Sequence, residues 1–552
     1  MIAGVLLPAG DFLGSKGAVM RALALVLMAS VSVIASPSWA AAEETARVVD
    51  EGMNRSEIML NAHELMDDIG PRLTISTNMR KAQDWAVAKF TRYGLTNVHR
   101  EGFVFGRGWD IVASSVRLVS PRPMALVAIP VAWTPPTKGA LSAPVVVAPM
   151  DRPEHFAAYR GKLAGKIVMI TLPGDGSEPG QAPFRRLTSE EISKEDKYDA
   201  PHFDPQEKNG FLKRIDFYRQ ADKFLAAEGA VAVIKKARTD GKLVFGEGYQ
   251  HALGDTPRLP TVEIAAEDYR RLARMAKLGE NPVVEINSDV RYLDDDSKAY
   301  NVIADIQGSD PKAGYVMAGA HFDSWVAGDG AADNGAGSVV VVEAARILRS
   351  LGVRPKRTIR FALWSGEEQG LYGSANYVQQ HLASRPGAIG PGGVLLWDNL
   401  IRNYPVTPGA GYGALKAYFN LDNGSGKIRG IYAEGNAAAV PILREWLSPF
   451  DDMGASTVVA GPTTGTDHEP FQAVAIPGFQ FIQDPLDYGS RVHHSSIDTV
   501  DHLKADDLRQ AAVIMASMLL SAANSDKELP RPPLPTQPTP TDPFKYELPE
   551  PK

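Results

Sequence analysis

The sequence contains no cysteine in 552 residues, and this absence excludes several functions. The chain can form no disulfide, can carry no lipid on a cysteine and can use no thiol as a nucleophile. Burial of apolar side chains, bound ligands or both must therefore hold it together. The Gly-x-Ser-x-Gly motif of many serine hydrolases is missing as well.

An excess of positive charge is also lacking. The 58 Lys and Arg residues are outnumbered by 65 Asp and Glu residues, which gives a net charge of −7. Proteins that bind nucleic acids generally carry a basic face. We therefore expect no nucleic-acid partner.

The N-terminal region has the pattern of a secretory signal. Met20 and Arg21 precede the apolar run 22–35, which is short for a membrane span, and small residues follow it. We interpret residues 1–42 as a cleavable signal peptide, with translation starting at the first residue or at Met20; a retained membrane anchor is the alternative. We expect a periplasmic or secreted bacterial protein with no membrane span after signal removal.

The chain is long enough for two or three domains, and its character changes along its length. Residues 43–125 begin with amphipathic helical patterning, residues 126–290 contain short strand-like runs, and residues 291–525 alternate strands with helices. Residues 526–552 form a proline-rich tail for which we predict disorder or an extended conformation. We expect a small β-rich domain, 126–290, inserted into a larger domain made of the two flanking parts.

From residue 300 onward, the alternation is typical of an α/β fold. The expected strands are 301–306, 315–320, 358–364, 415–421 and 478–483, and the expected helices are 335–352, 368–383, 438–450 and 505–524. This order predicts a mostly parallel sheet covered by helices on both faces. Ligands of such sheets bind at the carboxyl ends of the strands.

Polar residues follow the ends of these strands in the segments AHFDSW, GDGAADNGAG, FALWSGEEQG and RVHHSSIDT. A divalent metal ion needs neutral imidazole nitrogens and ionised carboxylates held by rigid backbone. The segments supply both, so a metal-dependent hydrolase is the leading interpretation. The residues expected to converge on one edge of the sheet are His321, Asp333, Glu367, Glu368, Asp422 and His494.

Residues 43–525 resemble the co-catalytic zinc exopeptidases, which include bacterial leucyl aminopeptidases, glutamate carboxypeptidases and the transferrin receptor. The segments HFDSW, SLGVRPKRTIRFALWSGEEQG and HHSSIDT carry this resemblance, which is nearest to the carboxypeptidase Q-like branch. The resemblance implies a phosphorylase/hydrolase-like zinc-peptidase domain, interrupted at residues 126–290 by a protease-associated domain. It also implies two Zn²⁺ ions per chain, with Co²⁺ or Mn²⁺ as substitutes.

The resemblance assigns a role to each candidate residue. Asp333 would bridge both metal ions and precede a cis peptide bond, and Glu367 would be the general base rather than a ligand. Asp323 would accept a hydrogen bond from the imidazole of His321 and so set its tautomer. The remaining ligands would be His321 and Asp422 at one ion, and Glu368 and His494 at the other.

Three further residues have roles that the sequence leaves open. Relatives often carry a tyrosine where this chain has His493, so either His493 or Tyr488 is expected to stabilise the oxyanion. Asp467 would either contact a substrate amine or orient His494. His493 and Asp467 each have a purely structural alternative as well.

The function that follows is an exported dinuclear zinc exopeptidase acting on peptides or dipeptides. A non-catalytic receptor or scaffold and a glutaminyl cyclase-like enzyme are the alternatives. The sequence leaves open whether the enzyme is an aminopeptidase or a carboxypeptidase or dipeptidase. The sequence leaves the oligomeric state open as well; a homodimer is one candidate assembly, by analogy with relatives that have an inserted domain.

Overall fold

The computed structural model describes residues 37–177, 180–198, 210–387, 401 and 403–536. The chain divides into two compact units, residues 1–43 and 44–552, and the description below concerns the second. Most of the predicted signal peptide and of the proline-rich tail lies outside the described residues. Within the described ranges, no helix is long and apolar enough to cross a membrane.

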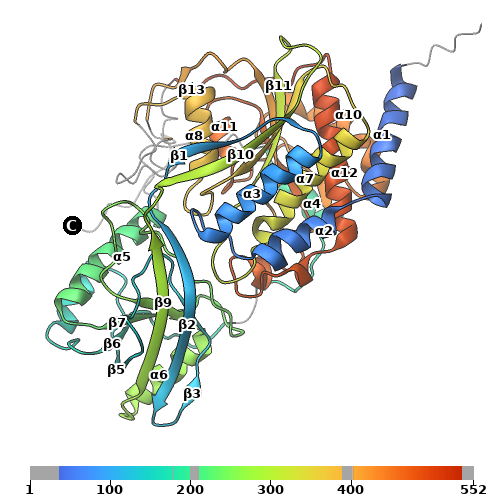
Figure 1. Ribbon diagram of the computed structural model, residues 1–552. Helices are drawn as coiled ribbons and strands as arrows, with labels where there is room; N and C mark the ends of the chain where they lie inside the picture. The colour runs from blue at the N-terminus through green and yellow to red at the C-terminus, as the bar shows by residue number, and fades with distance from the viewer. Residues whose placement is uncertain (1–36, 178–179, 199–209, 388–400, 402, 537–552) are drawn as a thin grey trace, which may run out of the picture. The chain divides into compact units, whose positions relative to one another are not determined.

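The first sheet has eight strands and a parallel centre. β12, β11, β15 and β18 run parallel to one another, whereas β1, β10 and β16 add antiparallel pairs at the sides. The mostly parallel α/β sheet predicted from the sequence is thus confirmed (Figure 1). In spatial order the strands are β1 (Thr96–Val104), β10 (Lys298–Ile306), β12 (Thr358–Trp364), β11 (Tyr315–His321), β15 (Leu415–Asn420), β18 (Gly478–Gln483), β16 (Ile428–Tyr432) and β17 (Thr457–Val459).

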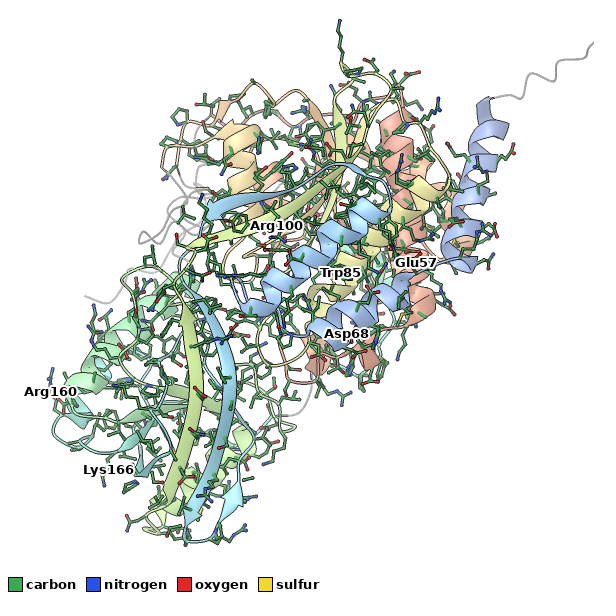
Figure 2. The ribbon with its side chains drawn as sticks, in the orientation of Figure 1. Glu57, Asp68, Trp85, Arg100, Arg160 and Lys166 are labelled. Atoms are coloured by element: carbon green, nitrogen blue, oxygen red, sulfur yellow. The ribbon has the colours of Figure 1, made fainter. Side chains whose placement is uncertain are left out.

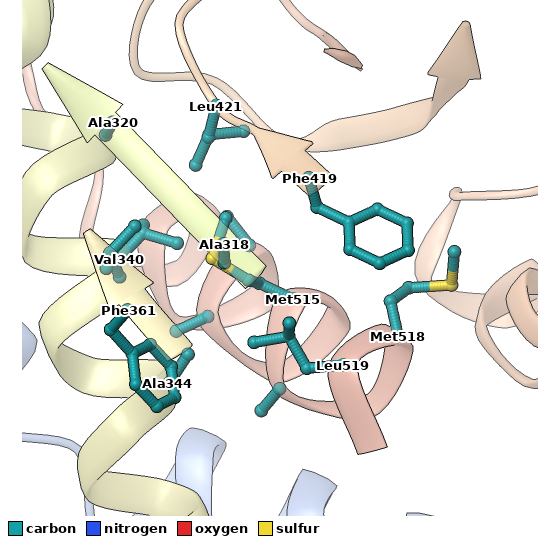
Figure 3. Packing of buried hydrophobic residues seen from close by; sticks show 14 of the residues in the cluster. Ala318, Ala320, Val340, Ala344, Phe361, Phe419, Leu421, Met515, Met518 and Leu519 are labelled. Carbon is teal, nitrogen blue, oxygen red and sulfur yellow. The ribbon is translucent and has the colours of Figure 1, made fainter. Parts of the chain in front are cut away.

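Helices bury both faces of this sheet because its strands are apolar on both sides. Ala318 and Ala320 of β11 face one cluster, and Met317, which precedes Ala318, faces another. α7 and α12 pack on the first face, where Val340, Met515 and their neighbours fill the space against the strands (Figure 3). The helices of this part are α1 (Pro37–Asn54), α2 (Ile58–Ala62), α3 (Thr77–Arg92), α7 (Ala336–Ser350), α8 (Tyr372–His381), α10 (Val440–Leu447), α11 (Glu469–Gln472) and α12 (Ala505–Asn524).

Short helical turns and a small sheet complete this part of the chain. β13 (Ala383–Ser384) and β14 (Thr407–Pro408) form a two-stranded sheet. The short turns are η1 (His63–Ile69), η3 (Ala331–Gly335), η4 (Ala437–Ala439), η5 (Ser448–Met453), η6 (Tyr488–Val492) and η7 (Val500–His502).

The N-terminal helices support the strand end that carries the predicted metal ligands. Trp85 of α3 donates from Nε1 to Glu64 at 2.6 Å, and its ring lies 6.3 Å from that of Phe322, directly after β11. Arg100 of β1, which is labelled in Figure 2, pairs with Asp84 of α3. The first sheet therefore contains β1 and β10 as neighbours, although the whole second sheet separates them in the sequence.

In the sequence, the strands of a second eight-stranded sheet lie between β1 and β10 of the first sheet. β2 and β9 are its long antiparallel pair, while β5, β6, β7 and β8 are parallel; α5 and α6 pack on it (Figure 1). The sheet begins at Gly108, before residue 126, because β2 pairs with β9; the protease-associated assignment stays a prediction. Its elements are β2 (Gly108–Ser120), β3 (Met124–Ala125), β4 (Ala128–Pro130), β5 (Leu141–Val147), η2 (Pro153–Tyr159), β6 (Ile167–Met169), α5 (Gly210–Ala227), β7 (Ala232–Lys236), β8 (Thr261–Ile264), α6 (Ala266–Lys277) and β9 (Val283–Leu293). The helix α4 (Ser189–Glu195) comes from this part of the sequence but packs against β17 of the first sheet.

Candidate metal centre

The ends of neighbouring parallel strands bring four predicted side chains together. His321 is the last residue of β11 and lies in register with Trp364, the last residue of β12. Glu367 and Glu368 follow the end of β12, and Asp422 follows the end of β15. The polar side chains therefore start from one edge of the first sheet.

Asp333 and His494 reach the same edge from η3 and from the loop after η6. Oδ1 of Asp333 is 3.2 Å from Nε2 of His321, and its Oδ2 is 3.1 Å from Nε2 of His494. Asp422 Oδ1 lies 3.3 Å from Nε2 of His321, and Glu368 Oε2 lies 3.0 Å from Nε2 of His494. The five residues thus form two groups that share the carboxylate of Asp333.

These donor atoms fit divalent metal ions. Oδ2 of Asp333, Oε1 of Glu368 and Oδ1 of Asp422 are buried and make no hydrogen bond. A buried carboxylate oxygen without a hydrogen-bond partner is costly, and a bound cation would satisfy it. Imidazole and carboxylate are also the ligands that zinc uses in hydrolases. His321, Asp333 and Glu368 place ligand atoms within 4.8 Å of one another.

The site has a strongly negative character. Burial raises the pKa of Glu367 well above its usual value, and the nearby carboxylates of Asp422 and Glu368 raise it further. Burial lowers the pKa of His321, but Asp422 and the other carboxylates more than compensate and hold that pKa well above its usual value. Neighbouring carboxylates add to the effect of burial at Glu367 and overcome it at His321, and such a cluster of carboxylates attracts a cation.

The backbone around Asp333 is held by a residue that the sequence analysis did not identify. Asp498 accepts hydrogen bonds from Ala332 N at 2.6 Å and from Asp333 N at 3.1 Å. The peptide bond between Asp333 and Asn334 is cis, as the resemblance implied. Asn334 Nδ2 donates to Leu421 O at 2.9 Å and so links this turn to the end of β15. Asp498 belongs to the HHSSIDT segment, which was the available signal.

Arg72 is a second unpredicted support, and nothing in its sequence context pointed to it. Its guanidinium is fully buried and donates to the carbonyl oxygens of Phe322 at 2.8 Å, Asp329 at 2.7 Å and Gly330 at 2.8 Å. Burial lowers the pKa of Arg72 to about 10, so the group stays charged at neutral pH. One side chain thereby joins the loop after His321 to the loop before Asp333.

Asp323 contacts His321 through its backbone carbonyl group and the glutamate pair through its carboxylate. Its backbone carbonyl oxygen lies 3.0 Å from Nδ1 of His321, whereas its carboxylate is 3.9 Å away. That carboxylate instead accepts from the backbone N–H groups of Glu367 at 3.2 Å and Glu368 at 3.3 Å. Asp323 thus faces the imidazole with its backbone carbonyl oxygen and not with its carboxylate.

The partner of His494 comes from an unexpected part of the chain. Its Nδ1 lies 2.7 Å from Oε1 of Glu247, in the segment between β7 and β8 of the second sheet. Asp467, which the sequence offers as a candidate for this contact, instead accepts from Ser374. No local pattern marks Glu247, because the contact spans 247 residues.

His493 and Tyr488 both lie beside the site. Nε2 of His493 is 3.5 Å from Oδ2 of Asp333, and its ring centroid is 4.7 Å from that of Tyr488. His493 also groups with Asp333 and His494 as ligand atoms within 4.8 Å of one another. The structure therefore brings both candidate oxyanion donors to the edge where the ligands meet.

Asp467 is fully buried and accepts a short hydrogen bond from the hydroxyl of Ser374. Its other oxygen, Oδ2, makes no hydrogen bond. Burial raises the pKa of Asp467 to about 7, against the lowering influence of His321. Asp467 is thus a buried carboxyl group whose Oδ2 can still accept a hydrogen bond.

A cavity of about 550 Å³ leads from the site into the second sheet. His493 and His494 line one end of it, and residues of β7, β8 and α5 line the rest. Its charged lining contains Arg214, Lys235, Arg238, Asp222 and Glu263, among others.

Comparison with known proteins agrees with this chemistry. Residues 301–519 match the family described as Peptidase family M28. Carboxypeptidase Q of Mus musculus is 27% identical over 471 residues, which cover 85% of this chain and 86% of the mouse protein. Leupeptin-inactivating enzyme 1 of Streptomyces exfoliatus is 32% identical over 232 residues, which cover 40% of this chain and 49% of that enzyme.

Solved structures show the same fold. A Peptidase M28 precursor from Shewanella amazonensis SB2B aligns with a TM-score of 0.62 at 24% identity, covering 90% of this chain and 99% of that one. BSAP, a zinc aminopeptidase from Bacillus subtilis, aligns with a TM-score of 0.54 at 20% identity, covering 85% of this chain and 95% of that one. At these identities the likeness concerns the fold alone.

Proposed function

Because residues 301–519 belong to peptidase family M28 and the chain is a zinc metallopeptidase, we propose that it is an exported dinuclear exopeptidase with Glu367 as general base. The resemblance expected from the sequence, including that to carboxypeptidase Q, is confirmed. Export, the number of ions and the roles of individual residues are the proposal.

The two-ion proposal rests on the carboxylate of Asp333, which offers one oxygen to the side of His321 and the other to the side of His494. His321 and Asp422 would hold one ion together with Asp333, and Glu368 and His494 would hold the other. Each group then has imidazole and carboxylate donors, the set that zinc accepts. Buried oxygens of Asp333, Glu368 and Asp422 that accept no hydrogen bond support this assignment.

Bound divalent ions would lower the pKa of a water molecule to about 7 and polarise a peptide carbonyl. Glu367 would accept the proton of the attacking water and deliver it to the leaving amine. The backbone N–H of Glu367 donates to the carboxylate of Asp323 at 3.2 Å, and this hydrogen bond fixes the backbone from which the Glu367 side chain extends. His493 or Tyr488 would donate a hydrogen bond to the oxyanion.

The proposed substrate is a short peptide or dipeptide that enters the 550 Å³ cavity. Its lining carries cations such as Arg214 and Lys235 and acids such as Asp222 and Glu263, so groups for either chain end are present. Asp467 is the proposed partner of a substrate amine, because Glu247 occupies the other role considered for it. Dipeptides with an acetylated amine or an amidated carboxylate would show which chain end the enzyme requires.

The two alternatives differ from this proposal in observable ways. A receptor or scaffold would bind no substrate for hydrolysis, and a cyclase would use one zinc ion and convert N-terminal glutamine. The full set of five ligand residues and Glu367 favours the peptidase. The signal peptide and the homodimer stay predictions of the sequence.

The first test is the metal content of the mature protein, together with hydrolysis of a leucine anilide and a panel of dipeptides. We expect about two zinc ions per chain in the wild type and in Glu367→Gln, with activity only in the wild type. Glu368→Gln serves as the control and should lose metal as well as activity. Wild-type protein that binds metal but hydrolyses no peptide would contradict the proposal.

A further inference from the structure

The second sheet contributes a carboxylate to the metal centre of the first. We propose that Glu247 is a positioning residue for His494, so that a segment outside the family-matched region 301–519 completes one of the two metal sites. This inference rests on the proposed two-ion site. It assigns a role in metal binding to Glu247 and to its ion-pair partner Arg238, which neither the family match nor the sequence pattern connects with metal.

The two ring nitrogens of His494 face different parts of the chain. Nε2 lies 3.0 Å from Glu368 Oε2 and 3.1 Å from Asp333 Oδ2, whereas Nδ1 lies 2.7 Å from Glu247 Oε1. An ionised Glu247 accepts the Nδ1 proton and leaves the Nε2 lone pair directed at the ligand carboxylates. The hydrogen bond therefore selects the tautomer that can bind metal at Nε2.

Glu247 is itself held in place. Arg238 pairs with its carboxylate through Nη1, while Nη2 of the same guanidinium donates to His493 O at 3.0 Å. The guanidinium stacks on the ring of Phe245, 3.8 Å from its centroid. Glu247 is thus held beside His494 as one partner of an ion pair with Arg238.

The backbone of this segment is joined to the loop that carries His494. Ser496 N donates to Val244 O at 2.9 Å, and Ser496 Oγ accepts from Val244 N at 3.4 Å. Gly248 lies so close to Ala132 that an added Cβ would be 2.2 Å from the Ala132 carbonyl oxygen. The segment therefore contacts both the second sheet and the loop that carries His494, so a shift of the sheet would also shift this loop.

The other histidine ligand has a different kind of support. Nδ1 of His321 faces the backbone carbonyl oxygen of Asp323 at 3.0 Å, within the first sheet. Substitution of Asp323 would leave its backbone carbonyl group in place, whereas substitution of Glu247 removes the only anionic partner described for Nδ1 of His494. Loss of Glu247 should therefore weaken one metal site and leave the other unchanged.

The test compares Glu247→Gln with Asp240→Asn. Asp240 is a carboxylate of the same sheet region, similarly exposed (19% against 20%) and also paired with an arginine, Arg270, but the contacts described for it are remote from His494. Zinc affinities would be measured by competition with a chromophoric chelator, and the visible spectrum of the Co²⁺-loaded protein would report the ligand geometry. Unfolding of the metal-free proteins would be followed in parallel.

We expect Glu247→Gln to bind one of the two ions about 10- to 100-fold more weakly, with the other ion and the metal-free stability unchanged. Asp240→Asn should keep both affinities and the wild-type cobalt spectrum. Equal affinities in Glu247→Gln and wild type would overturn the inference and leave the proposed function intact. An equal loss in Asp240→Asn would overturn it by showing a general effect of the sheet. Wild-type protein without metal would overturn both.

Discussion

At the scale of single residues, the arrangement around Asp333 determines the chemistry. Its carboxylate divides its two oxygens between the imidazoles of His321 and His494, at 3.2 and 3.1 Å. Each imidazole also has a hydrogen-bond partner at Nδ1, which fixes the orientation of the ring. Preorganised ligands reduce the reorganisation that metal binding would otherwise require.

His493 offers a direct test of the oxyanion donor. His493→Phe keeps an aromatic ring beside Tyr488 but removes the donor, so we expect an unchanged metal content and a kcat lowered by about 10²- to 10³-fold. Tyr488→Phe is the matched variant and should reduce kcat only if the phenol is the donor instead. Full kcat in His493→Phe, with metal retained, would exclude His493 from that role.

His251 gives the folded protein a predicted dependence on pH away from the metal site. Its ring stacks on Phe105 at 4.1 Å, and burial lowers the pKa of His251 to about 4. Since the unfolded chain binds this proton near pH 6.5, stability should fall as the pH drops from about 6.5 towards 4. The contribution lost between pH 7 and pH 5 is about 2 kcal/mol.

The variant His251→Phe should therefore lose about 2 kcal/mol less stability than wild type between pH 7 and pH 5. Denaturant unfolding at the two pH values measures the difference. The same substitution at His155, whose side chain is 43% exposed, is the control. An identical pH dependence in wild type and His251→Phe would contradict the assigned shift.

At the scale of elements, the parallel register of β11, β12 and β15 collects the ligands. His321 pairs in register with Trp364, so that the turns after both strands begin at the same level. The helix after β12 starts at Tyr372 rather than at the predicted Glu368, because Gly370 N and Leu371 N bond to Glu367 O. This turn keeps both glutamates at the edge of the sheet instead of inside a helix.

The start of α7 is packed closely enough to allow a test of this edge. A Cβ at Gly337 would lie 2.3 Å from Asn334 Oδ1 and 2.3 Å from Leu421 O. We expect Gly337→Ala to displace Asn334, to destabilise the fold by roughly 1–3 kcal/mol and to weaken metal binding. Calorimetry and metal analysis would measure both effects. Gly413→Ala is the control, since a Cβ there meets no atom within 4 Å.

At the scale of the whole molecule, the metal centre draws on segments far apart in the sequence. Arg72 and the N-terminal helices precede the second sheet, Glu247 belongs to it, and the ligands follow it. Arg186 extends these links by donating to the buried carboxylates of Asp484 at 2.9 Å and Asp507 at 2.8 Å. Metal binding should therefore stabilise the fold as a whole and not one loop.

Removal of metal should accordingly lower the thermal midpoint of the protein. Without cations, buried oxygens of Asp333, Glu368 and Asp422 accept no hydrogen bond, and the stabilisation by a ligand at 100 times its Kd, about 2.7 kcal/mol per site, is lost. Scanning calorimetry before and after chelation, and after return of zinc, measures the change. Asp422→Asn should respond less than wild type, and a midpoint insensitive to chelation would contradict a structural contribution of the metal.

Local patterns in the sequence are sufficient for the central strands, for α7 and α12, and for the residues that follow the strand ends. Their periodicity reflects burial on both faces of a parallel sheet, which neighbouring residues report directly. The pairing of β2 with β9 and the contacts of Arg72, Asp498 and Glu247 connect distant residues, and periodicity carries no information about them. The identity of the side chain that supports His494 depends on which surfaces meet when the sheets pack, so it is a property of the folded chain.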